Sequence, residues 1–113
     1  MITYFSMEGF LSVKKKVELY FVPKPHTRIT NTRFEDNFIH TPKYKLMKAV
    51  VLFGMNASGK SNVLLGMEHL ISMINRGLNL GAVDDMHRNL INFDCKTVAF
   101  EIGLYDVKSD QDY

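Results

Sequence analysis

The segment from residue 54 to residue 61 places glycines, a lysine and a serine at a spacing suited to holding phosphate groups. It reads Gly54-Met55-Asn56-Ala57-Ser58-Gly59-Lys60-Ser61 and matches the pattern G-x-x-x-x-G-K-[ST] without deviation. The two glycines permit a tight turn and a close approach of the backbone to phosphate oxygens because they lack a Cβ. We therefore predict a phosphate-binding loop in which Lys60 contacts the β- and γ-phosphates of a nucleotide and the Ser61 hydroxyl coordinates Mg²⁺.

The motif is flanked by the two elements that such a loop connects. Before it, Lys48–Phe53 is a short continuous apolar run, which is typical of a strand covered on both faces in a parallel sheet. After it, apolar residues recur at the spacing of one helix face: Val63, Leu64, Met67, Leu70, Ile71 and Ile74. Gly77 is a suitable end for this helix. This setting favours a phosphate-binding loop over a glycine-rich strand-to-helix turn that carries a lysine by chance.

Further strands are predicted on both sides of this unit. Residues 2–7 and Val17–Val22 are rich in β-forming residues and are separated by a reversal near Gly9, so they predict an N-terminal β-hairpin. Residues 26–45 predict a long loop with one short strand. Residues 97–105 alternate between core-type and solvent-type side chains and predict a further C-terminal strand. Together these elements assign the chain to the α/β class.

The nucleotide-binding segment also resembles a known family. Gly-x-Asn-x-x-Gly-Lys-Ser-Asn, read from Gly54 to Asn62, is similar to the Walker A motif of ATPases with ABC-type heads. These are the RecF, SMC and Rad50 group and the OLD-like or AAA15-type ATPases of prokaryotic defence systems. Gly9-Phe10-Leu11-Ser12 takes the place of a turn in that family, with glycine instead of asparagine and leucine where arginine is frequent. Asn92-Phe93 and the strand after it are similar to the stretch that follows the P-loop helix in AAA15-type members.

The resemblance implies ATP and Mg²⁺ as ligands and Mg-dependent ATP hydrolysis in the complete head. It implies a nucleotide site made of nine consecutive residues: Gly54, Met55, Asn56, Ala57, Ser58, Gly59, Lys60, Ser61 and Asn62. It also implies that residues 1–113 are the N-terminal lobe of a P-loop NTPase, an incomplete ABC-type domain. The partner expected for such a lobe is a missing C-terminal half or a second ATPase head in a dimer.

Several parts of an ABC-type head are not found in the sequence. No Leu-Ser-Gly-Gly-like signature is present, and Gln111, the only glutamine, lies in a polar tail. Leu80–Asp85 imitates the end of a Walker B strand, but Gly81 interrupts its apolar run and it follows the helix directly. We interpret this segment as a loop with helix-capping acids. The catalytic residues are therefore unknown, and we expect the isolated chain to be a weak or inactive ATPase.

Charge is distributed unevenly along the chain. The net charge is +2, yet residues 14–48 carry nine lysines and arginines against three acidic residues. Residues 84–113 carry seven acidic residues against three basic ones. This pattern indicates either two solvated surfaces of opposite sign or a basic surface that faces a polyanion. It leaves an alternative function open: a non-catalytic remnant or interaction module whose basic 14–48 region contacts DNA or a protein partner.

The remaining residue types predict no second site. The four histidines (residues 26, 40, 69 and 87) lack metal-ligand spacing among themselves and with Cys95. A single cysteine excludes an internal disulfide and favours a reducing, cytoplasmic location. The longest apolar run is too short to span a bilayer, so no membrane partner is expected. A small P-loop kinase or GTPase is disfavoured because neither a guanine-specifying Asn-Lys-x-Asp nor lid arginines are found.

Overall fold

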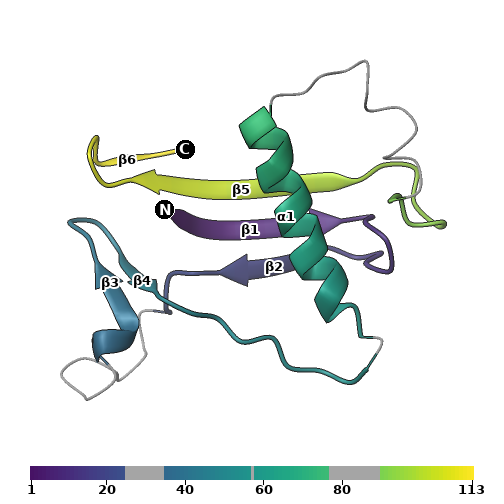
Figure 1. Ribbon diagram of the computed structural model, residues 1–113, viewed down its shortest axis with the longest axis horizontal. Coiled ribbons are helices and arrows are strands. Elements are labelled where there is room, and N and C mark those ends of the chain that lie inside the picture. The colour runs from purple at the N-terminus through teal and green to yellow at the C-terminus, as the bar shows by residue number, and fades with distance from the viewer. Residues whose placement is uncertain (25–34, 57, 77–89) are drawn as a thin grey trace. The chain divides into compact units, whose positions relative to one another are not determined.

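The computed structural model describes residues 1–24, 35–56, 58–76 and 90–113. These ranges contain strands β1 (Ile2–Glu8) and β2 (Val17–Tyr20), the 3-10 helix η1 (Glu35–Asn37), strands β3 (Phe38–His40) and β4 (Lys45–Met47), helix α1 (Lys60–Arg76), and strands β5 (Ala99–Asp106) and β6 (Gln111–Asp112). One antiparallel sheet has the order β2-β1-β5-β6, and β3 pairs with β4 in a second sheet (Figure 1). The described chain is thus of the α/β type, with antiparallel sheets and one α-helix.

The chain divides into two compact units. The first unit consists of Met1–Phe5, Leu19–Leu52 and Ile102–Tyr113, and the second unit consists of Ser6–Glu18 and Phe53–Glu101. Strands β1 and β5 therefore each contribute residues to both units. The predicted N-terminal hairpin and C-terminal strand are confirmed as β1, β2 and β5.

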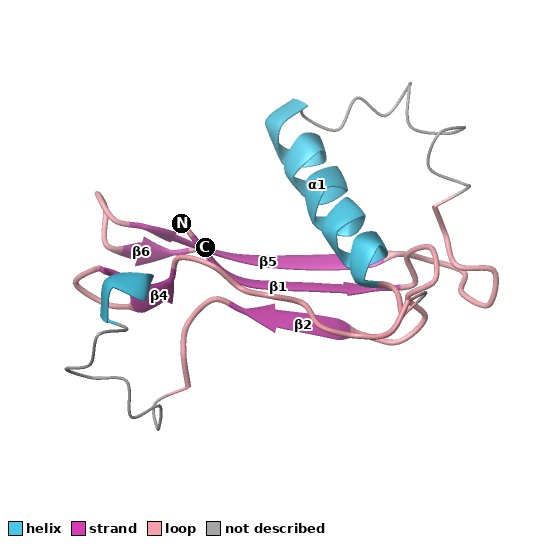
Figure 2. Cartoon of the chain, turned by 60° about the horizontal axis from the view of Figure 1, so that its bottom comes forward, coloured by secondary structure: helices cyan, strands magenta, loops and turns pink. Residues whose placement is uncertain are grey.

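The core of the second unit forms where α1 meets the ends of β1 and β5 (Figure 2). Met7 and Phe10 are almost completely buried, and the Phe10 ring meets the Phe100 ring edge to face with 5.5 Å between centroids. A Cβ at Gly66 would lie 2.4 Å from the Met7 sulfur. A larger residue at this position would therefore have to displace the buried Met7 side chain. Val63, one turn earlier, is buried on the same side.

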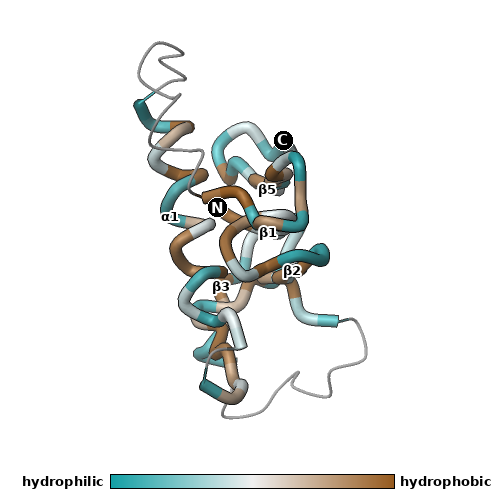
Figure 3. Tube along the Cα trace, turned by 90° about the vertical axis from the view of Figure 1, so that its right-hand side faces the viewer, coloured by the Kyte–Doolittle hydropathy of each residue, from teal (hydrophilic) through white to brown (hydrophobic). Residues whose placement is uncertain are grey.

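The predicted helix is confirmed as α1, which ends at Arg76; Gly77, its predicted stop, lies outside the described residues. Hydrophobic and hydrophilic residues alternate along it (Figure 3). Its apolar residues are not all covered, since Leu64, Leu65 and Ile74 are 48–59% exposed. Periodicity thus identified the helix but not which of its apolar side chains would be buried. In the described part of the chain, no helix combines the length and the hydrophobicity that a bilayer crossing requires.

The strand predicted for Lys48–Phe53 is not formed. These residues belong to no strand of the described chain, and Val51 and Phe53 are 67% and 91% exposed. A buried strand needs neighbours that satisfy its backbone groups and layers that cover both of its faces. The Lys48 N–H donates to the Asn37 carbonyl at 2.9 Å, but no strand of the described chain pairs with the run, so it is irregular and largely exposed. The prediction was wrong because it inferred that this segment is buried from its apolar residues alone.

The first unit is built around Tyr105, whose side chain is completely buried. The Tyr44 ring packs edge to face against the Tyr105 ring at 5.2 Å between centroids. The Tyr105 hydroxyl donates a hydrogen bond to Asp110 Oδ1 at 2.6 Å. The long loop with one short strand that was predicted for residues 26–45 is replaced, from residue 35 onward, by η1 and the β3–β4 hairpin. Residues 26–34 lie outside the described residues. Three-residue strands are too short to show a period-two pattern, which is why one of them was missed.

The C-terminal residues form a strand that the sequence did not indicate. Strand β6 pairs antiparallel with β5, placing Asp112 opposite Tyr105. The Asp112 carboxylate accepts hydrogen bonds from the Lys43 ammonium and from the Tyr44 hydroxyl at 3.0 Å. A polar two-residue strand carries no hydrophobic pattern, so only these tertiary contacts reveal it.

These contacts predict a pH dependence for the stability of the first unit. The hydrogen bond from Lys43 holds the pKa of Asp112 below its ordinary value. Because the folded-state pKa is the lower one, the ionised carboxylate stabilises the fold above about pH 4, and this contribution is lost as the pH falls through the folded-state pKa. We expect Asp112→Asn to lower the free energy of unfolding near neutral pH. Urea denaturation should show wild type and variant converging under acid, whereas a gap that is constant with pH would contradict the assignment.

Candidate phosphate-binding site

Residues 54–56 and 58–59 belong to an irregular, bent segment that leads directly into α1. The Ser58 N–H donates to the Met55 carbonyl at 3.2 Å, and the Val63 N–H donates to the Gly59 carbonyl at 3.0 Å, which is the first helical bond. Gly59 has φ = +88°, a left-handed conformation that glycine adopts without strain. The second glycine of the motif is therefore required by the backbone that the segment adopts.

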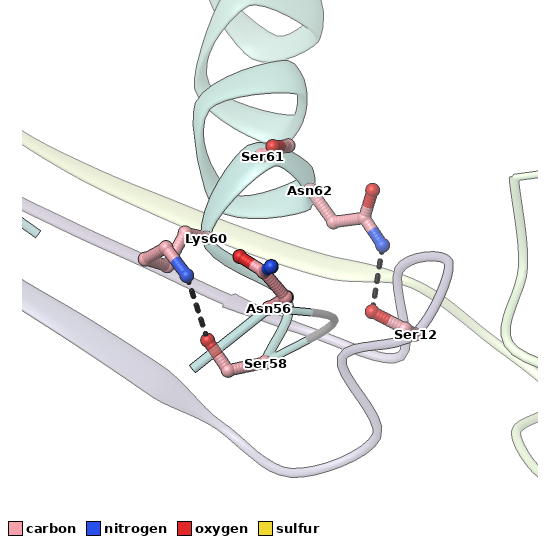
Figure 4. Close-up of a pocket in the computed structure, with 7 residues that line it drawn as sticks. Ser12, Asn56, Ser58, Lys60, Ser61 and Asn62 are labelled. Atoms are coloured by element: carbon pink, nitrogen blue, oxygen red, sulfur yellow. Dashed lines mark hydrogen bonds between the residues drawn. The ribbon is translucent and has the colours of Figure 1, made fainter. Parts of the chain in front are cut away.

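The Lys60 side chain folds back over this turn (Figure 4). Its ammonium donates to the carbonyl oxygens of Gly54 at 2.8 Å and Met55 at 2.7 Å. It also donates to Ser58 Oγ at 3.3 Å. A Cβ at Gly54 would lie 2.7 Å from that same Oγ, so the first glycine gives the turn room to close. The ammonium is thus directed at the loop.

The start of α1 carries positive charge, and its first turn contains no acidic side chain that would offset it. The first turn of the helix contains no aspartate or glutamate, and the N-terminal end of a helix is itself partially positive. Within the described residues, Lys14, Lys43 and Lys45 each pair with a carboxylate, whereas Lys60 contacts only neutral oxygens. A lysine at a helix N-terminus is locally unfavourable by about 0.3–1 kcal/mol. A residue type that lowers local stability, such as a lysine at a helix N-terminus, is typical of a functional site.

A hollow of about 370 Å³ opens beside this charge. Its lining consists of hydroxyls, amides, a glycine and the lysine: Ser12, Asn56, Ser58, Gly59, Lys60, Ser61 and Asn62. Lys60 and Asn62 leave the helix start on opposite sides (Figure 4). Nearly all of these groups can donate hydrogen bonds, so the hollow suits an anion with several oxygens.

Six of the nine predicted site residues line this hollow, namely those at 56, 58, 59, 60, 61 and 62. Gly54 and Met55 contribute carbonyl oxygens to Lys60 instead, and the Met55 side chain is 84% exposed. Ala57 lies outside the described residues. Among those residues, no group of three or more histidine, cysteine, aspartate or glutamate side chains could hold a metal ion.

Ser12 is a site residue that the motif did not identify. It lies in the turn after β1, and its hydroxyl accepts a hydrogen bond from the Asn62 side-chain amide at 2.6 Å. A Cβ at Gly59 would lie 3.3 Å from the same hydroxyl. The only signal in the sequence was the position of Ser12 at the end of the Gly9–Ser12 turn, because the motif itself lies more than forty residues away.

Residues 90–92 hold the turn that carries Ser12. The Leu11 N–H donates to the Leu90 carbonyl at 2.8 Å, and the Asn92 N–H donates to the Gly9 carbonyl at 2.8 Å. The Asn92 side-chain amide donates to the Leu11 carbonyl at 2.5 Å. Leu11 has a positive φ of 48°, so these bonds stabilise a strained backbone. Asn92 thus positions the wall of the hollow, while its neighbour Phe93 is fully exposed.

Other sequence features do not join this site. Gln111 belongs to β6 in the first unit. His40 lies 3.2 Å from a Glu35 carboxylate oxygen, and the His69 ring packs against Phe10. His26, His87 and the Walker B-like segment at 80–85 lie outside the described residues.

Comparison of the chain with protein-family models, with curated proteins and with solved structures gave no match. The function is therefore argued from the residues and geometry of the hollow.

Proposed function

We propose that the chain binds a nucleoside triphosphate with Mg²⁺, ATP by the resemblance of its motif, and that it forms the N-terminal lobe of a P-loop NTPase. The observation that carries the proposal is the Lys60 ammonium held over a glycine turn at a helix start, where its contacts within the described part of the chain include no carboxylate. A triphosphate supplies the negative charge that this arrangement lacks. The turn residues and the helix start would hold its oxygens through charge-assisted hydrogen bonds.

Four side chains of the hollow have a role in this proposal. Lys60 contacts the β- and γ-phosphates by exchanging its carbonyl contacts for phosphate oxygens. Ser61 supplies a hydroxyl to Mg²⁺, which neutralises phosphate charge when bound. Mg²⁺ needs few protein ligands because phosphates and water complete its shell, so a cluster of acidic residues is not required. Asn62 and Ser12, which are joined by a hydrogen bond, line the side of the hollow opposite Lys60.

Hydrolysis is proposed to depend on residues from outside the described fold. The exposed apolar run that includes Val51 and Phe53 supports this view, because such a run is normally covered by neighbouring strands. A C-terminal half or a second ATPase head would supply both the cover and the catalytic groups. We therefore expect nucleotide binding with little turnover by this chain.

Calorimetric titration with ATP in the presence and absence of Mg²⁺ tests the proposal. Wild type should bind ATP, and Mg²⁺ should tighten binding by about tenfold or more. Ser61→Ala should remove most of the Mg²⁺ effect while retaining metal-free binding, because only the metal ligand is lost. Ser109→Ala, which changes a serine of the first unit, is the control. Equal Mg²⁺ effects in wild type and Ser61→Ala would contradict the role of Ser61, and no ATP binding would contradict the function.

The alternative, a module that binds DNA through residues 14–48, has less support. Three lysines of that segment contact carboxylates of the acidic segment: Lys14 with Asp94 at 3.0 Å, Lys16 with Glu101 at 3.2 Å, and Lys43 with Asp112. Their charge is partly neutralised within the chain, which lowers its attraction for a phosphate backbone. DNA binding that weakens steeply with salt and persists in Lys60→Ala would favour the alternative.

A further inference from the structure

A second hollow lies farther along the face of α1 that borders the phosphate-binding hollow. It has a volume of about 230 Å³. Its walls are mostly apolar, formed by Phe10 and Leu11 from the turn after β1, Leu65 from the helix, and Leu90. Three polar helix residues, Glu68, His69 and Ser72, complete the lining. All of these residues belong to the second unit.

The residues that line the two hollows are neighbours along the chain, although none of them lines both. Leu11 of the second hollow precedes Ser12 of the first along the same turn. Leu65 follows Ser61 and Asn62 by four and three residues, so it occupies the next helix turn on the same face. The same turn and the same helix therefore border both hollows. The first hollow by itself, at about 370 Å³, falls in the range of small-molecule sites, about 300–1,000 Å³.

The chemistry of the second hollow differs from that of the first. Leu11 and Leu65 offer apolar surface, and the His69 ring lies 6.0 Å between centroids from the largely buried Phe10 ring. The Glu68 carboxylate would repel a phosphate group. The first hollow thus favours an anion. The second favours an uncharged, partly apolar group with a planar ring that can pack beside the two aromatic rings.

We propose that the second hollow receives the nucleoside of the bound nucleotide, an inference that rests on the proposed function. With the phosphates at Lys60, the ligand would run along α1 past Ser12 and Asn62. Its nucleoside then packs against Leu65 and Leu11 beside the Phe10 and His69 rings. The positive charge of Lys60 and the negative charge of Glu68 fix this direction, because the reverse placement would bring phosphates against a carboxylate. Leu65 is accordingly a residue that distinguishes a nucleotide from a bare polyphosphate.

The test compares ATP with tripolyphosphate, each with Mg²⁺, by calorimetric titration. Wild type should bind ATP at least about tenfold more tightly than tripolyphosphate. Leu65→Ala should weaken ATP binding about threefold to tenfold, because apolar contact is lost, and should leave tripolyphosphate binding unchanged. Leu64→Ala is the matched control, since Leu64 is a similarly exposed leucine of the same helix that does not line the hollow. It should bind both ligands as wild type does.

The outcomes separate this inference from the proposed function. If wild type binds both ligands equally, or if Leu65→Ala leaves ATP affinity unchanged, the nucleoside site is wrong while the phosphate site stands. If Leu65→Ala lowers the affinities for ATP and tripolyphosphate equally, the nucleoside site is also wrong, because the substitution then affects the binding of the phosphates. If neither ligand binds, both the proposed function and this inference fail. Because Leu65 is 48% exposed, the variant should fold as wild type does, and circular dichroism checks this.

Discussion

Lys60→Ala is expected to lower the affinity for Mg-ATP by at least about 100-fold. The ammonium would contact two phosphate groups, and hydrogen bonds to charged groups contribute about 1.5–3 kcal/mol each. The loss of two such contacts corresponds to about 3 kcal/mol or more, which is a factor of about 100 in affinity at 25 °C. Isothermal titration calorimetry of the purified chain measures this difference directly.

Lys15→Ala is the matched control for this substitution. Lys15 is an exposed lysine that does not line the phosphate-binding hollow, so its loss removes the same charge without a contact to phosphate. We expect less than a twofold change in ATP affinity, because a distant exposed charge is screened by salt. Equal binding by the Lys60 and Lys15 variants would show that the motif does not act as a phosphate site. Comparable thermal unfolding of both variants without ATP would show that the fold is intact.

Gly9→Ala is expected to have the largest effect on stability. Gly9 has φ = +74°, and a Cβ there would lie 2.3 Å from the Thr97 carbonyl oxygen. A left-handed conformation costs a non-glycine residue about 1–3 kcal/mol, and here a backbone carbonyl must also move. The Asn92 N–H that donates to Gly9 would shift with it. We expect the free energy of unfolding to fall by about 3 kcal/mol or more, measured by urea denaturation.

The neighbouring substitution Glu8→Ala separates this effect from a general weakening of β1. Glu8 ends the strand and is exposed, so its replacement should change the free energy of unfolding by less than about 0.5 kcal/mol. A Gly9→Ala protein as stable as wild type would mean that the turn tolerates a side chain. Because this turn carries Ser12, the Gly9 variant should also weaken ATP binding wherever it remains folded.

The sequence predicted the part of the candidate site whose residues lie close together in the chain. Gly54, Gly59 and Lys60 are close enough in the chain for their spacing to define a turn and a helix start, and the structure has both. The helical spacing of Val63 and the residues after it likewise indicated α1 without knowledge of its neighbours. Whether this turn binds phosphate remains a prediction for the titrations above.

The strand predicted at Lys48–Phe53 shows where local reasoning fails. An apolar run indicates that burial of the segment would be favourable. Whether the segment is buried depends on neighbouring strands and on layers that cover both faces. In the described residues these partners are absent, and Phe53 is exposed. The opposite error concerns β6, a polar pair of residues that became a strand because Lys43 and Tyr44 hold Asp112. Both outcomes depend on partners distant in sequence.

Sequence alone determined the glycine turn, the lysine at its end and the helix that follows, because each depends on backbone preferences within a few residues. The tertiary structure decided which residues distant in sequence contact these elements. It brought Ser12 to Asn62 across 50 positions and Lys14 to Asp94 across 80. It also placed Leu11 and Leu65 at one hollow. Such contacts follow from how the strands and the helix pack, and packing depends on the whole chain because each element is covered by residues far from it in sequence.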